Sequence, residues 1–232
     1  MNNVKNVVLM YHSVGASNSG EKGAELYCLS VEKFRGQIEY LVRVTQSPTR
    51  PATLYIITFD DGDIKNYTNA YPALKELGLK AYFFIIASKV GTPGYMTWKQ
   101  IKELADAGMV IGSHGMTHRI LTELSDIELD FELSESKKMI EEKIEKKIDN
   151  LSIPKGYYNK RVIDKAREVG YGVVFTSDNR ISVKASWSLE YFKRVIEKGY
   201  PFHEVAKESS KKVLKKVLGA KCYTKLRTLI LK

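Results

Sequence analysis

The sequence lacks the residues and runs that mark disulfide-rich or membrane-spanning proteins. Its two cysteines, Cys28 and Cys222, lie far apart and predict neither a disulfide framework nor a cysteine-based metal site. No apolar run is long enough to cross a bilayer. The N-terminus has no signal-peptide pattern of charge, apolar stretch and small-residue cleavage site. We therefore expect a cytoplasmic protein, although the removal of a leader would give the same pattern.

The composition is that of an ordinary globular protein. The 232 residues are 44% hydrophobic and 28% charged, which fits one medium-sized domain with a core. The net charge of +10 is unevenly placed. Residues 207–232 contain nine Lys or Arg and one acid, so they carry +8, whereas residues 1–206 contain 28 bases and 26 acids and carry +2.

The basic segment 207–232 shows apolar residues at spacings of three and four, with lysines between them. This pattern predicts an amphipathic helix. The helix either packs on the preceding domain or lies on the anionic inner surface of a membrane. Few aromatic residues interleave the lysines, so we expect no nucleic-acid binding. We accordingly divide the chain into a main domain, 1–206, and a basic C-terminal helix, 207–232.

Short apolar runs alternate with helical patterns along the first three quarters of the chain. Two helix starts carry capping boxes, Thr97 with Gln100 and Ser125 with Glu128, and the second helix is expected to continue to about residue 148. Such alternation is typical of an α/β protein, and its length fits a single (β/α) barrel with a parallel sheet. Strands are expected over 7–11, 54–59, 81–86, 109–112, 150–153 and 172–176.

Polar residues follow two of these strands, at the edge where a barrel builds its active site. Asp60 and Asp61 come just after the strand over 54–59, and His114 and His118 just after the strand over 109–112. Either motif alone is often a turn or a solvated helix face. Together, Asp61, His114 and His118 supply the three ligands that a hydrolytic zinc site usually needs, with one position left for water.

The second carboxylate has a different predicted role. Neighbouring residues of a strand point to opposite faces, so Asp60 and Asp61 converge only if the strand breaks there, which Gly62 permits. Asp60 is then placed to act as general base on the bound water. A spacing of four residues would put His114 and His118 on one side of the chain if that segment were helical.

His12 ends the first strand. From the residues alone, it is equally a satisfied core histidine or a functional group.

The segments Thr58-Phe59-Asp60-Asp61-Gly62 and Ser113-His114-Gly115-Met116-Thr117-His118 resemble those of the polysaccharide deacetylases of carbohydrate esterase family four. The resemblance runs from about residue 7 to residue 176. It implies a distorted (β/α) barrel of about seven parallel strands that removes acetyl groups from N-acetylated sugars. It also implies that Asp60 is the catalytic base and that Asp61, His114 and His118 bind the metal, by default zinc, with cobalt or nickel also suited to these ligands.

The opening Leu9-Met10-Tyr11-His12-Ser13-Val14 is similar to the branch that includes the poly-N-acetylglucosamine deacetylases. In that branch an N-terminal histidine replaces the catalytic histidine found near the C-terminus of other members. The resemblance therefore makes His12 the candidate general acid, with His203 as the downstream alternative.

Other family positions are altered in this chain. The third motif reads Ile153-Pro154-Lys155-Gly156 instead of Arg-Pro-Pro-Tyr-Gly or Tyr-Pro-Tyr-Gly. The base-orienting arginine is absent and Lys155 stands where tyrosine is usual. The backbone N–H of Lys155 could still donate to an oxyanion, and its side chain either attracts an acidic substrate group or is simply solvated. In a blurred fourth motif, Asp178 could orient a catalytic histidine and Trp187 could line the acetyl pocket.

Three functions remain open from the sequence. The first is a metal-dependent deacetylase acting on an N-acetylhexosamine in a glycan, glycolipid or nucleotide-linked sugar. The second is a catalytically weak relative that binds glycan or membrane without turnover, suggested by the altered third motif. The third is hydrolysis of a non-sugar amide on the same scaffold.

Overall fold

The computed structural model describes residues 5–16, 27–45, 53–176 and 190–196, which all belong to one compact unit, Met1–Lys198. Asp178, Trp187, His203 and the predicted helix 207–232 lie outside the described residues. The domain boundary at residue 206 therefore stays a prediction. None of the described helices is both long enough and apolar enough to span a membrane.

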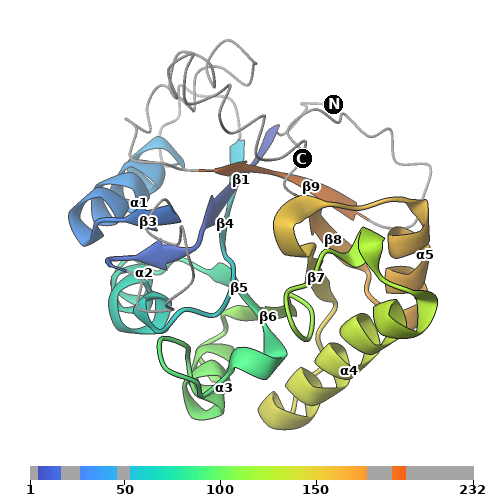
Figure 1. The fold of residues 1–232 in the computed structure, drawn as a ribbon. Coiled ribbons are helices and arrows are strands. Elements are labelled where there is room, and N and C mark those ends of the chain that lie inside the picture. Colours follow the sequence, from blue (N-terminus) through green and yellow to red (C-terminus); the bar gives the residue numbers. More distant parts are fainter. Residues whose placement is uncertain (1–4, 17–26, 46–52, 177–189, 197–232) are drawn as a thin grey trace. The chain divides into compact units, whose positions relative to one another are not determined.

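Parallel strands form a closed barrel (Figure 1). Strand β1 pairs with β4 on one side and with β9 on the other, so the first and last strands close the ring. This architecture confirms the predicted α/β barrel of about seven strands, although β9 was not predicted. In barrel order the strands are β1 (Lys5–Tyr11), β4 (Thr53–Phe59), β5 (Ala81–Ile85), β6 (Val110–Ser113), β7 (Asn150–Ser152), β8 (Val173–Thr176) and β9 (Glu190–Ile196).

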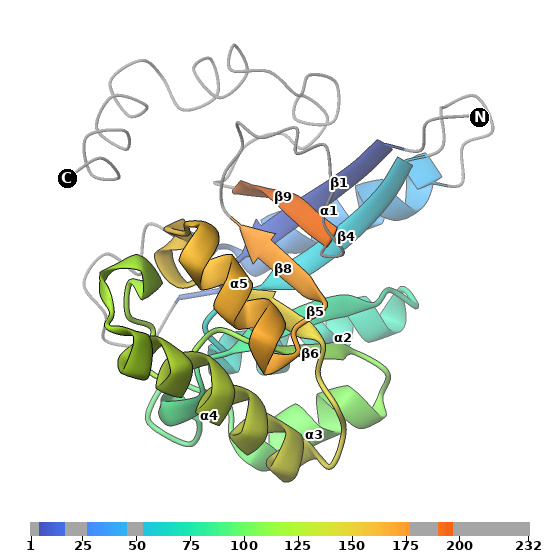
Figure 2. The ribbon, with the colours of Figure 1, turned by 90° about the vertical axis from the view of Figure 1, so that its right-hand side faces the viewer.

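The remaining elements lie around and above this barrel. A small parallel pair, β2 (Ser13–Val14) and β3 (Cys28–Leu29), follows β1 and was not predicted from the sequence. Figure 2 shows helices α3, α4 and α5 on the outside of the strands. The helices are α1 (Val31–Thr45), η2 (Asn66–Ala70), α2 (Tyr71–Glu76), η3 (Ala87–Lys89), α3 (Trp98–Asp106), η4 (Leu121–Glu123), α4 (Asp126–Ile144), η5 (Pro154–Gly156) and α5 (Lys160–Val169).

The capping boxes predicted at Thr97 and Ser125 are both present, at the starts of α3 and α4. Helix α4 ends earlier than expected, at Ile144 instead of about residue 148. Glu145 adopts a left-handed conformation with φ 57°, and this stops the helix. The N–H of Ile148 then donates to the Glu141 carboxylate at 3.0 Å, which turns the chain toward β7.

Side chains of alternating strand residues form two apolar layers. Val8, Ile56, Phe84 and Phe175 form a buried cluster that joins four strands. On the other face, Tyr11 and Phe34 of α1 meet edge to face with ring centroids 5.2 Å apart, and Phe59 stacks on Phe83 at 4.9 Å. Aromatic pairs of this kind contribute about 0.5–1.5 kcal/mol beyond their burial. These layers fix the strand ends that carry the site.

Gly112 allows β5, β6 and β7 to approach one another closely. A Cβ atom at this position would lie 2.6 Å from the Phe84 ring and 2.8 Å from the Asn150 carbonyl oxygen. Any larger residue would push β6 away from a neighbour, and the next residues of that strand lead into His114.

Candidate metal centre

The chain breaks immediately after β4, at Asp60 and Asp61. The Asp60 N–H still donates to the Tyr11 carbonyl oxygen at 2.9 Å, as a continuation of the sheet. Asp61 and Gly62 then adopt φ of 71° and 83°. Aspartate is one of the few residues with a side chain that enters this left-handed region routinely. The turn allows two consecutive carboxylates to face one site, as the sequence predicted, and it begins one residue earlier than the glycine suggested.

His114 follows β6 and is held from two sides. Its N–H donates to the Ile85 carbonyl oxygen at 2.8 Å, and its ring is almost fully buried. Nδ1 lies 2.8 Å from the Ser152 carbonyl oxygen, which only accepts hydrogen bonds. Nδ1 therefore carries a proton, and Nε2, which lies 3.5 Å from Oδ1 of Asp61, is the nitrogen that remains to bind a cation. This is the tautomer that a metal ligand needs.

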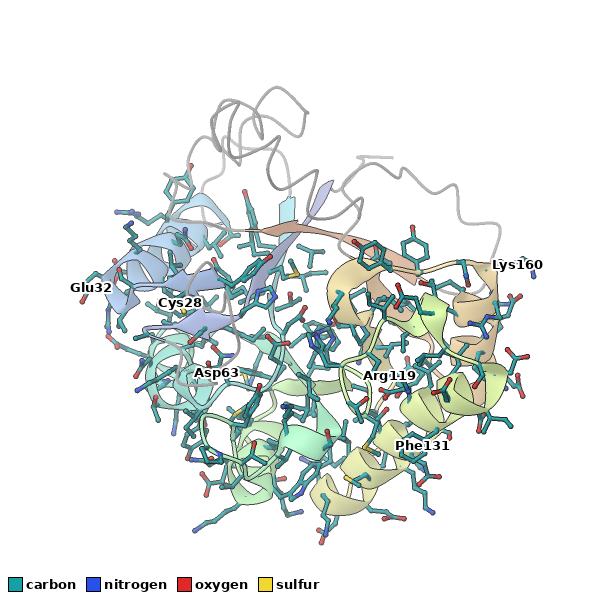
Figure 3. The ribbon with its side chains drawn as sticks, viewed as in Figure 1. Cys28, Glu32, Asp63, Arg119, Phe131 and Lys160 are labelled. Carbon is teal, nitrogen blue, oxygen red and sulfur yellow. The ribbon has the colours of Figure 1, made fainter. Side chains whose placement is uncertain are left out.

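His118 reaches the same place through a turn. Residues 114–118 are not helical, so the helical condition considered for the i, i+4 spacing is not met. Gly115 and His118 instead adopt φ of 78° and 66°, which folds the segment back until the two imidazole centroids are 4.9 Å apart. Arg119, which is labelled in Figure 3, is the next residue in the chain after His118.

The three predicted ligands lie within reach of a single cation. Nε2 of His114 and Nε2 of His118 are each 3.5 Å from Oδ1 of Asp61, and the three ligand atoms all lie within 4.8 Å of one another. Ligand atoms 2.0–2.1 Å from a tetrahedral zinc ion lie about 3.3–3.4 Å apart. Two of the three pairs are close to this spacing, and the Asp/His/His donor set suits a divalent metal.

The cluster is partly open. The side chains of Asp61 and His118 are 23% and 18% exposed, whereas that of His114 is 2% exposed. The Asp61 and His118 side chains are therefore partly open to solvent, whereas the His114 ring is enclosed.

Asp60 lies beside the cluster but is not part of it. Its Oδ2 is 3.8 Å from Nε2 of His114 and accepts a hydrogen bond from the Ser152 hydroxyl at 3.3 Å. The carboxylate is buried, at 3% side-chain exposure. The catalytic role of Asp60 stays a prediction.

His12 lies at the corresponding end of the neighbouring strand. Tyr11 pairs with Phe59 in the β1–β4 register, so His12 and Asp60 follow paired residues. The His12 carbonyl oxygen accepts a hydrogen bond from Nδ2 of Asn66 at 2.7 Å, and its half-buried ring lies 4.8 Å from that of Tyr27. Burial, and then the negative charge of Asp61, raise the pKa of the Tyr27 phenol. Both aromatic rings thus belong to the surroundings of the metal cluster.

Lys155 lies in the turn that follows β7. It adopts φ of 57° and is exposed, while the next residue, Gly156, has φ of 78° and donates its N–H to the Ile153 carbonyl oxygen at 3.1 Å. The structure therefore places the altered third motif at the same end of the barrel as the carboxylates and histidines. Its role in oxyanion binding stays a prediction.

Several residues that support the site were not predicted. Ser152 occupies the position of the arginine in the Arg-Pro-Pro-Tyr-Gly pattern and contacts both Asp60 and, through its carbonyl oxygen, His114. Glu132 and Ser136 of α4 bind the segment around His114. The available signal was their spacing, because both polar residues interrupt the apolar stripe formed by Leu129, Leu133 and Ile140.

The fold and the site together define an α/β-barrel protein with an Asp/His/His cluster, and comparisons with known proteins agree. The sequence profile of the polysaccharide deacetylase family matches residues 47–174, more than half of the chain. YxkH of Bacillus subtilis (strain 168), whose name assigns it provisionally to the polysaccharide deacetylases, is 32% identical over 178 residues. These residues cover 74% of this chain and 64% of YxkH. The chain therefore belongs to the polysaccharide deacetylase family.

Two further comparisons concern a named enzyme and a solved structure. A peptidoglycan-N-acetylglucosamine deacetylase of Bacillus cereus is 31% identical over 145 residues, which are 62% of this chain and 66% of that protein. The chain thus spans slightly less than two thirds of the length of these two relatives. The structure of IcaB from Ammonifex degensii has a TM-score of 0.73 at 24% identity and covers 90% of this chain and 98% of IcaB. This likeness supports the barrel fold.

Proposed function

We propose that the protein is a metal-dependent hydrolase that removes the N-acetyl group from an N-acetylhexosamine in a glycan, glycolipid or nucleotide-linked sugar. The observation that carries the proposal is the meeting of Asp61, His114 and His118 around one point, with Asp60 beside them. Family membership and the names of the relatives support the sugar substrate. A divalent cation held by these three residues would supply Lewis acidity and lower the pKa of a coordinated water.

The chain's own groups then divide the proton transfers of amide hydrolysis. Asp60 takes a proton from the water whose oxygen attacks the amide carbonyl carbon. The backbone N–H of Lys155 donates to the carbonyl oxygen as it gains negative charge. His12 gives a proton to the sugar nitrogen as the C–N bond breaks, and acetate and a free amine leave. No bond to the protein forms at any step.

The support for these roles is positional. Asp60 is buried, oriented by Ser152 and close to the cluster, as a base acting on water there must be. His12 lies at the end of the adjacent strand, on an element whose backbone is fixed by Asn66. Asp60 must be ionised and His12 protonated at the start of the reaction, so we expect a bell-shaped pH dependence of kcat/KM.

The deciding experiment combines metal analysis with acetate release from a panel of N-acetylated glycans. Asp60→Asn is expected to keep its metal and to lose about 10²–10⁴-fold in kcat/KM, which is the usual contribution of a general base. His12→Ala is expected to lose a similar factor. Full activity of Asp60→Asn would remove the proposed base. Loss of turnover in His203→Ala but not in His12→Ala would reassign the acid.

A catalytically weak glycan-binding relative is the second candidate, and the sequence Ile153-Pro154-Lys155-Gly156 favours it. Here the arginine and the aromatic ring of the third motif are both replaced. This protein would bind the metal and N-acetylated oligosaccharides but release no acetate. Turnover of small linear or cyclic amides in place of sugars would instead point to the third candidate, a non-sugar amidase.

We also propose that residues 207–232, which lie outside the described residues, contact an anionic membrane at its cytoplasmic face. Their net charge of +8 supports this proposal. The full chain should co-sediment with vesicles that contain anionic lipid at low salt and should not do so with neutral vesicles. If equally little protein sedimented with both kinds of vesicle, packing of this segment on the domain would be favoured.

A further inference from the structure

Helix α4 has an unusual distribution of polar and apolar residues. Its inward face carries Leu129, Leu133, Ile140 and Ile144, each at most 1% exposed, yet Glu132 and Ser136 on the same face are exposed by 1% and 0%. Two large apolar residues, Ile127 and Phe131, are instead 84% and 50% exposed, and Figure 3 shows Phe131 on the outer side of the helix. Burying a carboxylate costs free energy unless it is hydrogen-bonded, so its presence on the apolar face of the helix needs a specific explanation.

The partners of Glu132 all belong to the segment between the two histidine ligands. Its Oε2 accepts hydrogen bonds from the N–H groups of Met116 at 2.8 Å and Thr117 at 2.9 Å. Its Oε1 accepts a hydrogen bond from the Thr117 hydroxyl. Three neutral donors thus compensate the desolvation of one charge, and all three come from the loop that joins His114 to His118.

Ser136, one helical turn further along, holds the start of the same loop. Its hydroxyl lies 2.9 Å from the hydroxyl of Ser113, which in turn accepts a hydrogen bond from the N–H of Gly115 at 3.1 Å. We call Glu132 and Ser136 the α4 clamp. Between them they bind residues 113, 116 and 117, and Ser113 in turn binds the N–H of Gly115.

The clamp explains how the loop keeps an unfavourable backbone. His118 has φ of 66°, a conformation that costs a non-glycine residue of its kind about 1–3 kcal/mol unless its surroundings enforce it. A Cβ atom at position 115 would also lie 3.0 Å from Oε2 of Glu132, and Gly115 has φ of 78°, so a larger residue would be disfavoured there. The loop that presents His118 is therefore shaped by a carboxylate that does not reach the cluster itself.

We propose that Glu132 is a positioning residue that fixes the His114–His118 loop in its ligating shape before metal binds, and so sets the metal affinity. This inference rests on the proposed function, since it takes Asp61, His114 and His118 to be the ligands. Glu132 acts through the N–H groups of Met116 and Thr117 and touches neither metal nor substrate.

The test uses Glu132→Gln in the full chain, with Glu141→Gln as its matched control. Glu141 lies on the same helix and has 11% side-chain exposure, and its partners are Lys137, Lys147 and the N–H of Ile148. Zinc affinity of the metal-free protein is measured by competition with a chelating dye. Glutamine keeps the shape of Glu132 but turns an NH₂ group toward the loop donors, so we expect a 10–100-fold loss of affinity, as for other partners that orient ligands. Glu141→Gln should stay within about threefold of the parent.

Thermal unfolding with and without zinc separates positioning from general stability. Both variants are expected to melt at lower temperature without metal, but only Glu132→Gln should gain less from added zinc than the parent. Thr117→Ala removes one donor and keeps the carboxylate. It should fold and lose about two- to tenfold in zinc affinity, the effect of one hydrogen bond, even if Glu132→Gln fails to fold.

Parental zinc affinity in a folded Glu132→Gln, or in Thr117→Ala if the first variant does not fold, would overturn the inference. A parent protein that takes up no zinc, cobalt or nickel would instead overturn the metal dependence of the proposed function.

Discussion

Two carboxylates of α4, the fully buried Glu132 and the partly buried Glu141, are compensated by different kinds of donor. Glu141 is neutralised by two lysines and also accepts the N–H of Ile148, whereas Glu132 is surrounded by amide and hydroxyl donors. Burial alone would raise the pKa of Glu141, but the hydrogen bonds from Lys147 and Lys137 lower it below its usual value. Glu141 is thus compensated mainly by lysine ammonium groups and binds one backbone N–H. A carboxylate that binds successive N–H groups dictates the shape of a loop.

The same contrast extends to the backbone. Among the described residues, four non-glycine residues have positive φ, and three of them, Asp61, His118 and Lys155, follow strands at the site. The fourth, Glu145, only ends α4. Unfavourable conformations are therefore concentrated where side chains must converge, as is common at functional sites. The following changes test this division, from the largest expected effect to the smallest.

Asp61→Asn is expected to have the largest effect, because it removes the charge of a predicted ligand and keeps the backbone conformation of the turn. Asparagine accepts positive φ, so the turn is kept, while the oxygen that lies 3.5 Å from both Nε2 atoms loses its charge. We expect zinc affinity to fall by more than about 100-fold, because loss of a ligand exceeds the 10–100-fold loss typical of an orienting partner. Chelator competition measures this, with Asp63→Asn as the control in the same loop. Unchanged affinity in Asp61→Asn would remove it from the ligand set.

Ser152→Ala should affect turnover and spare the metal. The change deletes the hydroxyl that donates to Asp60 at 3.3 Å but keeps the carbonyl oxygen that fixes His114. A bond of this length to a charged group is at the weak end of its range, so we expect about a tenfold loss in kcat. Zinc affinity should stay at the parental value. A drop in zinc affinity with unchanged kcat would contradict this separation.

Tyr171→Phe tests a buried phenol that contacts α4 between Glu132 and Glu141, where its hydroxyl donates to the Leu133 carbonyl oxygen. Burial is the main cause that raises the pKa of Tyr171 to about 12, while hydrogen bonds with Ser113 and Ser136 lower it and the charge of Glu141 raises it. Because the folded state keeps its proton longer than the unfolded state, this stabilisation is complete below pH 10 and is lost as pH rises from 10 to 12. The loss amounts to about 2–3 kcal/mol.

Urea unfolding at pH 8 and near pH 12 measures this contribution. The free energy of unfolding of the parent should fall more steeply with pH than that of Tyr171→Phe. Parallel curves for the two proteins would mean that the phenol is as easily ionised in the folded state as in the unfolded state.

Glu128→Gln should have the smallest effect, because this carboxylate is at the surface. The pKa of Glu128 is lowered to about 2, first by the N–H of Ser125, then by the Ser125 hydroxyl and Arg119. A lowered pKa gives stability that is present above pH 4.5 and is lost as pH falls toward 2. Urea midpoints at pH 7 and pH 3 should therefore converge more closely in the variant than in the parent. An equal pH dependence would argue against the capping box as its source.

The sequence predicted those parts of the fold that depend on local signals. Apolar runs located six of the barrel strands, and the Thr97 and Ser125 capping boxes located the starts of α3 and α4. Strand β9 and the β2–β3 pair were missed. The end of α4 was also missed, because it depends on a left-handed Glu145 and on a contact from Glu141 to Ile148. Such contacts have no signature in the run of residues around them.

The candidate site shows the same limit. The motifs were enough to bring Asp60, Asp61, His114 and His118 together, because polar residues after parallel strands meet at one edge. The way in which they meet was not predicted, since His118 arrives through a turn and not along a helix. Glu132 and Ser152 were missed because each acts on groups distant in sequence. A buried glutamate in a helix looks the same from sequence whether lysines or main-chain amides surround it.

The bond between His114 and Ser152 also has a mechanical consequence. Among the strand pairs that the structure describes, β6 and β7 share the shortest register, a single residue pair, Ser113 with Leu151. The hydrogen bond from the His114 imidazole to the Ser152 carbonyl oxygen, at 2.8 Å, therefore adds a side-chain link between the two strands with the shortest pairing. Loss of the His114 ring should increase local opening of the β6–β7 pair, which would be measured as faster amide hydrogen exchange in both strands. Loss of the His118 ring should leave amide exchange in these two strands unchanged.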